Sequence, residues 1–174
     1  MIANATFRLP YFPSTRSEKP SSFQDKTTTA PEPSKNSITI DSSIDEVSSV
    51  LSDLESYPSW TTAIKKVEVL ERDSSNRPSR VTIAIEAGVL KDRASLTYDW
   101  SKLPGEITFS LDEADMMTEM SGSYLIKDNG DDTTTVTYSL TTQISMPVPE
   151  MMRKKVELST IDAALSQLKK RVEG

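Results

Sequence analysis

Six consecutive segments of alternating apolar and polar residues constrain this chain more than any other feature. Short turns separate the segments, and such alternation is typical of strands with one buried face. The six segments therefore predict an antiparallel meander. Their inward-facing residues are Val67 and Val69; Val81, Ile83 and Ile85; Ala94, Leu96, Tyr98 and Trp100; Ile107, Phe109 and Leu111; Met120, Gly122, Tyr124 and Ile126; and Val136, Tyr138, Leu140, Thr142 and Ile144.

A long helical pattern follows the strands, over residues 149–173, after Pro147 and Pro149. At about 1.5 Å per residue, a helix of that length spans roughly 35 Å and can cross most of a six-stranded sheet. We expect its apolar stripe to face a large surface. The apolar residues are Met151, Met152, Val156, Leu158, Ile161, Ala164, Leu165, Leu168 and Val172.

The part before the meander predicts one strand and two helical segments. Residues 37–41 alternate and read as a strand, and Ser43 with Glu46 forms a capping box that starts a helix. Pro58 disfavours the α conformation at Tyr57, so the first helix should end there and a second turn, with Trp60, should begin at Pro58. The predicted order is strand, two helices, six strands and a helix, an α+β fold.

Residues 1–36 differ in composition from the rest, with five of the ten prolines and many Ser and Thr residues. We expect this segment to be disordered and residues 37–174 to form the domain. Arg8, Pro10 and Pro13 interrupt the apolar residues near the start, which argues against a signal peptide. No stretch is long and apolar enough for a membrane span, so we expect a cytoplasmic protein without integral membrane association.

Three stretches, together with this order of elements, resemble the START-like or SRPBCC superfamily, in particular its polyketide cyclase/dehydrase and coenzyme Q-binding branch. They are residues 53–60 (DLESYPSW), residues 122–125 (GSYL) before a Thr-rich strand, and residues 168–173 (LKKRVE). The resemblance covers residues 37–173. It implies a helix-grip fold, in which a curved antiparallel sheet surrounds the long C-terminal helix, and a cavity used for lipid carriage, hormone binding or ring-closing catalysis.

Composition excludes several kinds of chemistry. The chain has no histidine and no cysteine, which removes Ser-His-Asp catalysis, thiolate nucleophiles and the usual zinc sites. Its five glycines form no phosphate-binding motif, and no cofactor or metal is predicted. Of the net charge of −6, residues 1–36 carry +2, which leaves −8 on the domain. An acidic domain is a poor partner for nucleic acid.

No catalytic residue is assigned. Alternation turns Glu86, Asp99 and Glu119 to the outer face of the sheet, where a carboxylate keeps an ordinary solvated environment. The acidic groups at residues 112–115 and 128–132 lack the spacing of a calcium loop, and turn chemistry explains the second of them.

Aromatic and flexible apolar residues remain as candidates for ligand contact, although packing in the core explains each of them about as well. Buried tyrosine hydroxyls need polar partners, which suits a pocket, and six of the seven methionines cluster at positions 116, 117, 120, 146, 151 and 152. The predicted ligand-contacting residues are Trp60, Ile85, Leu96, Tyr98, Trp100, Phe109, Met120, Tyr124, Tyr138, Met152 and Val156.

Three functions are compatible with these residues. The leading hypothesis is a protein that binds or carries a hydrophobic small molecule, such as a lipid, isoprenoid or polyketide. The second is a cyclase, aromatase or dehydratase that uses the same cavity and an inward-facing acid or base. The third is a partner-binding module with a basic helix surface, formed by Lys154, Lys155, Lys169, Lys170 and Arg171. The sequence leaves the oligomeric state open.

Overall fold

The structure, a computed structural model, describes residues 31–174, and its elements follow the predicted order. The long strands come from the alternating segments, and the C-terminal helix comes from the periodic segment after Pro149. The elements are β1 (Ser34–Ile40), α1 (Ile44–Ser52), the 3₁₀ helix η1 (Leu54–Ser56), α2 (Tyr57–Trp60), β2 (Ile64–Arg72), β3 (Pro78–Ala87), β4 (Leu90–Asp99), β5 (Glu106–Ala114), β6 (Met117–Asp128), β7 (Thr134–Ile144) and α3 (Glu150–Glu173).

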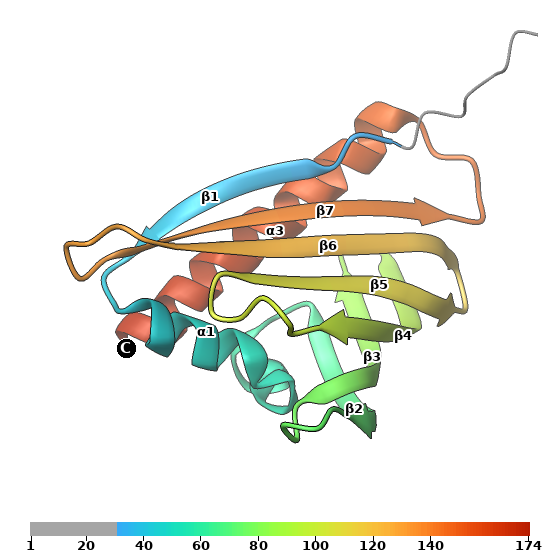
Figure 1. Ribbon diagram of the computed structural model, residues 1–174. Helices are drawn as coiled ribbons and strands as arrows, with labels where there is room; N and C mark the ends of the chain where they lie inside the picture. Colours follow the sequence, from blue (N-terminus) through green and yellow to red (C-terminus); the bar gives the residue numbers. More distant parts are fainter. Residues whose placement is uncertain (1–30) are drawn as a thin grey trace, which may run out of the picture. The chain divides into compact units, whose positions relative to one another are not determined.

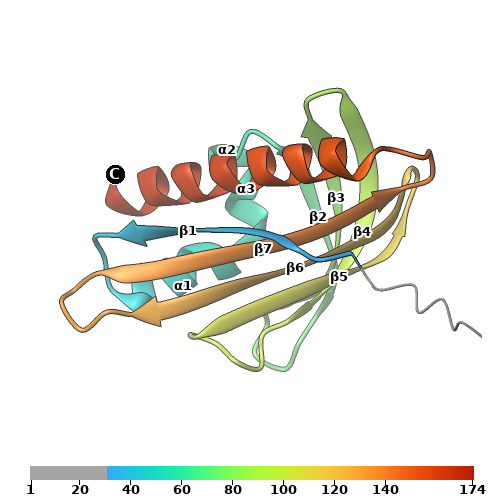
Figure 2. The same cartoon turned by 90° about the horizontal axis from the view of Figure 1, so that it is seen from above.

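The seven strands form one antiparallel sheet in the order β1-β7-β6-β5-β4-β3-β2. The meander from β2 to β7 is confirmed, and β1 closes the sheet by pairing with β7. The sheet curves strongly, and α3 runs along β7 and β1 (Figure 1, Figure 2). Helix α1 lies near the C-terminal end of α3. This is the helix-grip fold that the family resemblance implies.

The first strand begins at Ser34, three residues earlier than predicted. Ser34 pairs with Leu140, and its side chain is buried beneath α3, so residues 34–36 belong to the sheet. The Pro-rich composition just before this strand concealed its start. The disorder expected for residues 1–30 lies outside the described residues.

The helical segment before the sheet begins as predicted and ends differently. The Ser43 side chain accepts a hydrogen bond from the Glu46 amide (3.3 Å), which is one half of the capping box. Tyr57, however, adopts the α conformation despite Pro58 (φ −52°, ψ −41°). Its hydroxyl donates to the Leu51 carbonyl, and this buried contact fixes Tyr57 as the first residue of α2. The local rule for the residue before proline is overridden by packing.

The turn between β6 and β7 is not the tight two-residue hairpin that an Asn-Gly pair, here Asn129-Gly130, often forms. Gly130 and Asp132 have positive φ (79° and 63°), whereas Asn129 does not. The Asn129 side chain instead donates to Thr133 (2.9 Å) and Thr135 (3.1 Å), which holds the base of a longer loop.

Helix α3 buries a narrower stripe than expected, because it packs mainly on β1 and β7 and not across the whole sheet. Its fully buried residues are Glu157, Ile161, Leu165 and Leu168. Four apolar residues of the first turns, which the sequence placed on the buried stripe, are instead exposed: Met151, Met152, Val156 and Leu158.

The two faces of the sheet have different chemistry. The inner face carries the core, and its side chains come from every strand of the meander. The outer face is rich in short hydroxyl side chains that bond across strands, as in Ser37 with Thr137 (2.7 Å) and Thr82 with Ser95 (3.1 Å). The core therefore lies entirely on the side that the helices cover.

Candidate functional site

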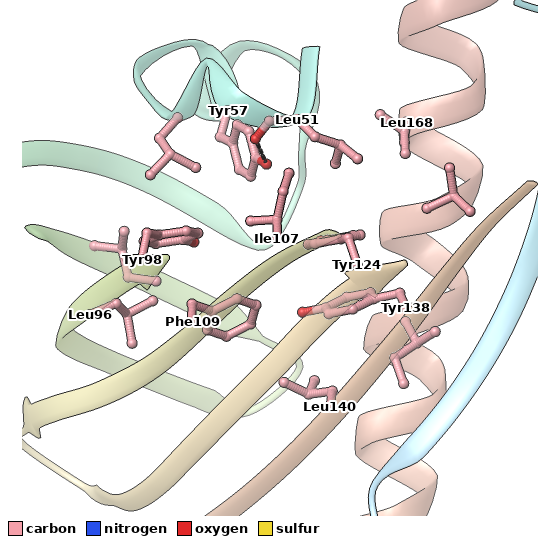
Figure 3. Packing of buried hydrophobic residues seen from close by; sticks show 14 of the residues in the cluster. Leu51, Tyr57, Leu96, Tyr98, Ile107, Phe109, Tyr124, Tyr138, Leu140 and Leu168 are labelled. Carbon is pink, nitrogen blue, oxygen red and sulfur yellow. Dashed lines mark hydrogen bonds between the residues drawn. The ribbon is translucent and has the colours of Figure 1, made fainter. Parts of the chain in front are cut away.

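An aromatic cluster lines the middle of the inner face. The ring of Phe109 lies 5.4 Å from that of Tyr98 and 6.5 Å from that of Tyr138, measured between centroids. Tyr138 stacks on Tyr124 at 4.2 Å. Figure 3 shows these rings side by side on neighbouring strands, with Tyr57 above them. Five of the predicted site residues, Leu96 included, therefore belong to one continuous surface, and all five are buried.

The two tryptophans occupy different places. Trp100 stacks on Tyr98 (5.1 Å between centroids) and donates from its indole N–H to the Pro78 carbonyl (2.7 Å). Trp60 lies on α2, where it meets Tyr57 edge to face at 4.8 Å. The structure brings Trp100 into the aromatic cluster and leaves Trp60 beside it, on the helix.

Gly122 provides the space for Phe109. The two residues pair across β5 and β6, and a Cβ atom at Gly122 would lie 2.3 Å from Cζ of Phe109. Carbon atoms in contact lie about 3.5 to 4.0 Å apart. The Phe109 ring can therefore lie over β6 only because residue 122 has no side chain.

Burial keeps the tyrosines of the cluster protonated. It raises the pKa of Tyr138 to about 12, although a hydrogen bond with Tyr124 partly opposes the rise. Burial is also the main cause that raises the pKa of Tyr57, Tyr98 and Tyr124, followed by the other tyrosines of the cluster. These hydroxyls are neutral at physiological pH and can donate or accept hydrogen bonds.

The inner face is closed at one end and open at the other. Ile107, Ile126 and Val136, toward α1, are between 0 and 3% exposed. At the opposite end, where α3 begins, several apolar residues of the inner face are half-buried, although Met117 among them is only 5% exposed. We call this region the open end; its residues are Ala87 of β3, Leu111 and Ala114 of β5, Met120 of β6 and Ile144 of β7.

Two flanks of α3 can be told apart by their contacts. On one flank, Gln167 bonds with Thr62, which precedes β2. On the other, Asp162 accepts from Asn36 of β1. Val156 precedes Gln167 by eleven residues, and Met152 precedes Val156 by four. Residues at these spacings share a helix face, so both lie on the Gln167 side of α3. We call this the inner flank; it overlooks the concave sheet, and Val156 and Met152 are 48% and 59% exposed there.

A buried carboxylate fastens the first turns of α3 to the sheet. Glu157 accepts hydrogen bonds from Ser34 Oγ (2.6 Å), from the Thr142 amide (2.7 Å) and hydroxyl (2.9 Å), and from Arg153 Nη1 (2.7 Å). Sequence reasoning missed this network. The available signal was an Arg and a Glu four residues apart, with the Glu four residues before Ile161 in the buried stripe.

A second buried carboxylate holds the loop at the open end. Asp92 accepts from the amides of Arg93 (2.8 Å), Asp115 (3.1 Å), Met116 (3.1 Å) and Met117 (2.8 Å). It therefore fixes the turn between β5 and β6. This role also escaped the sequence analysis, since Asp92 looks like one more acidic residue near a turn.

The remaining acidic candidates lie where alternation placed them. Glu86 and Asp99 are exposed, and Glu119 pairs with Gln143, which is itself exposed. Asp131 accepts from Thr133 within the β6–β7 loop, in agreement with turn chemistry. No group of three acidic residues within 31–174 is arranged to hold a metal ion.

The basic residues of α3 lie on its surface. Lys154 pairs with Glu150 (3.2 Å), and Lys169 pairs with Glu173 (3.4 Å) and donates to the Thr39 carbonyl. A shallow depression on the flank away from the inner face is bordered by α3 alone, from Glu150 to Asp162, and does not enclose a volume. None of the helices in the described part of the chain is long and apolar enough to cross a membrane.

The fold, with an aromatic cluster on the inner face of its curved sheet, defines a helix-grip protein. Residues 34–173 match the family described as polyketide cyclase/dehydrase and lipid transport. The chain therefore belongs to this family. No curated protein is similar enough to count as a match.

Solved structures share the fold. A START superfamily protein from Mycobacterium smegmatis is 25% identical, with a TM-score of 0.77 over 82% of this chain and 98% of that one. A protein from Thermus thermophilus is 19% identical, with a TM-score of 0.71 over 81% and 97%. The Zhui aromatase/cyclase from Streptomyces sp. R1128 is 17% identical, with a TM-score of 0.63 over 80% and 92%. The last two likenesses concern the fold alone.

Proposed function

We propose that this protein binds a hydrophobic small molecule on its inner face, which the ligand reaches through the open end. The observation that carries the proposal is the gradient of burial along the strands. Ile107, Ile126 and Val136 are sealed toward α1, whereas several apolar side chains become partly accessible where α3 begins. Accessible contiguous apolar surface of this kind is typical of a binding site.

The site as proposed has a wall, a mouth and a few polar groups. The aromatic cluster, with Tyr98 and Tyr138, forms the wall, and Met120 of the sheet with Met152 and Val156 of α3 forms the mouth. Neutral tyrosine hydroxyls are available to orient a ligand. Affinity would come mainly from burial of apolar area, at about 25 cal/mol per Å². A lipid, isoprenoid or polyketide has the required character.

The enzymatic alternative, a cyclase or dehydratase, gains less support from these contacts. It needs an acid or base that faces the ligand. The groups that act on the pKa of Tyr98 and Tyr138 are other tyrosines and burial, without a neighbouring Lys, Arg or carboxylate. Glu157, the fully buried carboxylate of α3, already accepts four hydrogen bonds. We therefore place ligand binding ahead of catalysis.

The neutral fluorescent probe N-phenyl-1-naphthylamine tests the proposal. We expect its fluorescence to rise on binding to the full chain, and Val156→Glu to weaken the binding about tenfold or more by placing a charge at the mouth. Leu158→Glu is the matched control. Leu158 is 41% exposed, against 48% for Val156, but lies on the opposite side of the same helix. Equal effects of the two substitutions, or no binding at all, would refute the proposal.

A further inference from the structure

Arg153 is a charged side chain with unused donors at the mouth of the proposed site. Its side chain is only 13% exposed. Nη1 donates to Glu157 at 2.7 Å, whereas Nη2 lies 3.9 Å from Glu150, beyond hydrogen-bond distance. Val156 follows three residues later, so the two side chains are neighbours on the surface of α3.

An arginine presents five N–H donors, and those without a partner are costly to bury. No fully enclosed side-chain nitrogen or oxygen in the described part of the chain lacks a partner. The guanidinium nitrogens that Arg153 leaves unpaired must therefore reach accessible space. Val156, three residues further along α3, is the neighbour of Arg153 on the inner flank, so we infer that this space borders the inner flank.

The charges around Arg153 decide which ligand group suits these donors. Glu157 is fully buried against the guanidinium, and Glu150 lies on its other side. The domain as a whole carries −8 (−6 for the chain, less +2 for residues 1–36). A ligand carboxylate would add a further negative charge to a site whose positive charge is already balanced. An uncharged oxygen can accept the free N–H groups without that repulsion.

We propose that Arg153 is the specificity-determining polar residue of this site, and that it donates to an uncharged oxygen of an otherwise apolar ligand. Ketone, ester and hydroxyl oxygens all fit this description. The inference rests on the proposed function, because it needs a ligand on the inner face. The inference also states a ligand preference. The site should bind neutral, oxygen-bearing molecules more tightly than fatty acids or plain hydrocarbons.

The test compares three probes with the same chain length, 2-undecanone, undecane and undecanoic acid, as competitors of N-phenyl-1-naphthylamine at pH 8. The wild-type protein is expected to bind the ketone about tenfold more tightly than undecane, the usual contribution of a hydrogen bond from a charged donor. The acid is expected to bind more weakly than the ketone.

The Arg153→Lys variant keeps a positive charge beside Glu157 but loses the forked donors, and Arg153→Met loses both. In Arg153→Met the ratio of ketone to undecane affinity should fall about tenfold or more, because the ketone oxygen loses its donor. In Arg153→Lys it should fall less, because the ammonium still donates but without the fork. Using this ratio cancels any general loosening of α3, and Lys154→Met, one residue further along, should leave it unchanged.

The possible failures can be told apart. A wild-type preference for the acid, or a ratio that stays the same in both Arg153 variants, overturns the role of Arg153 while ligand binding stands. If none of the three competitors displaces the fluorescent probe from the wild-type protein, the proposed function is contradicted as well.

Discussion

Replacing Gly122 with alanine adds a single methyl group where Gly122 of β6 pairs with Phe109 of β5. The new Cβ atom would lie 2.3 Å from Cζ and 2.7 Å from Cε1 of Phe109, and 3.0 Å from the Ser139 carbonyl oxygen. Since carbon atoms need about 3.5 Å, the ring must move by about 1.2 Å. It cannot move freely, because Tyr98 and Tyr138 lie on either side.

Overpacking of this kind costs about 1 to 3 kcal/mol. Removing a glycine from a strand returns about 0.5 to 1 kcal/mol through the unfolded state. We therefore expect Gly122→Ala to lower the free energy of unfolding by about 1 to 2 kcal/mol, measured by urea denaturation with tryptophan fluorescence. Trp100, which stacks on Tyr98, should report the disturbance.

Gly105→Ala is the matched control, because its Cβ atom would have only the Lys102 carbonyl oxygen nearby, at an ordinary 3.6 Å. We expect it to change the free energy by less than about 0.5 kcal/mol. Phe109→Leu in the Gly122→Ala background should recover part of the loss, since the shorter side chain frees the space. The reasoning is refuted if Gly122→Ala is as stable as wild type, or if the two substitutions are simply additive.

Three further predictions concern the charged and phenolic groups. Glu157→Ala should lower the free energy of unfolding by about 3 kcal/mol, because it leaves buried Arg153 unpaired. Glu150→Ala is the control and should change this free energy little, because the Glu150 side chain is 70% exposed. Similar losses in the two variants would contradict the structural role of Glu157. Asp92→Asn should cost about 2 kcal/mol, because an amide nitrogen then meets the amides of residues 115–117; exposed Glu86→Gln is its control in the same denaturation assay. The pKa of each tyrosine in the cluster lies above its ordinary value of about 10, so their contribution to stability is full below about pH 10 and falls as pH rises toward 12. Absorbance of tyrosinate near 295 nm in a Tyr11→Phe variant should stay low at pH 10 in the folded state, and a full titration there would disprove the burial.

The strands and the long helix could be predicted because their periodicity is a direct record of which side faces the core. Residues 64–72 and 150–173 fall almost where the pattern placed them. Tyr57 and Ser34 could not be predicted, since a buried hydroxyl contact and a long-range strand pair overrode their local signals. Periodicity also shows that an apolar residue lies on the apolar stripe of a helix. It does not show how much of that stripe the sheet covers. For this reason the pattern predicts that Met151 and Leu158 face inward, although α3 packs mainly on β1 and β7.

The candidate site was predictable in its apolar part and not in its polar part. Alternation alone places Tyr98, Phe109 and Tyr138 on one face, and the register confirms it. Arg153 and Glu157 look in the sequence like an ordinary helical surface pair. What sets them apart is a serine more than a hundred residues away, and no pattern within a helix contains that information.

The hydroxyl pairs on the outer face of the sheet bear on how such a protein can change over evolution. Ser37 with Thr137 and Thr82 with Ser95 join neighbouring strands without any contribution from the inner face. These pairs help to align the strands on the face opposite the proposed site. Inner side chains are consequently free to be exchanged for others of similar volume, and one scaffold can acquire new ligand preferences while its strand register is inherited unchanged.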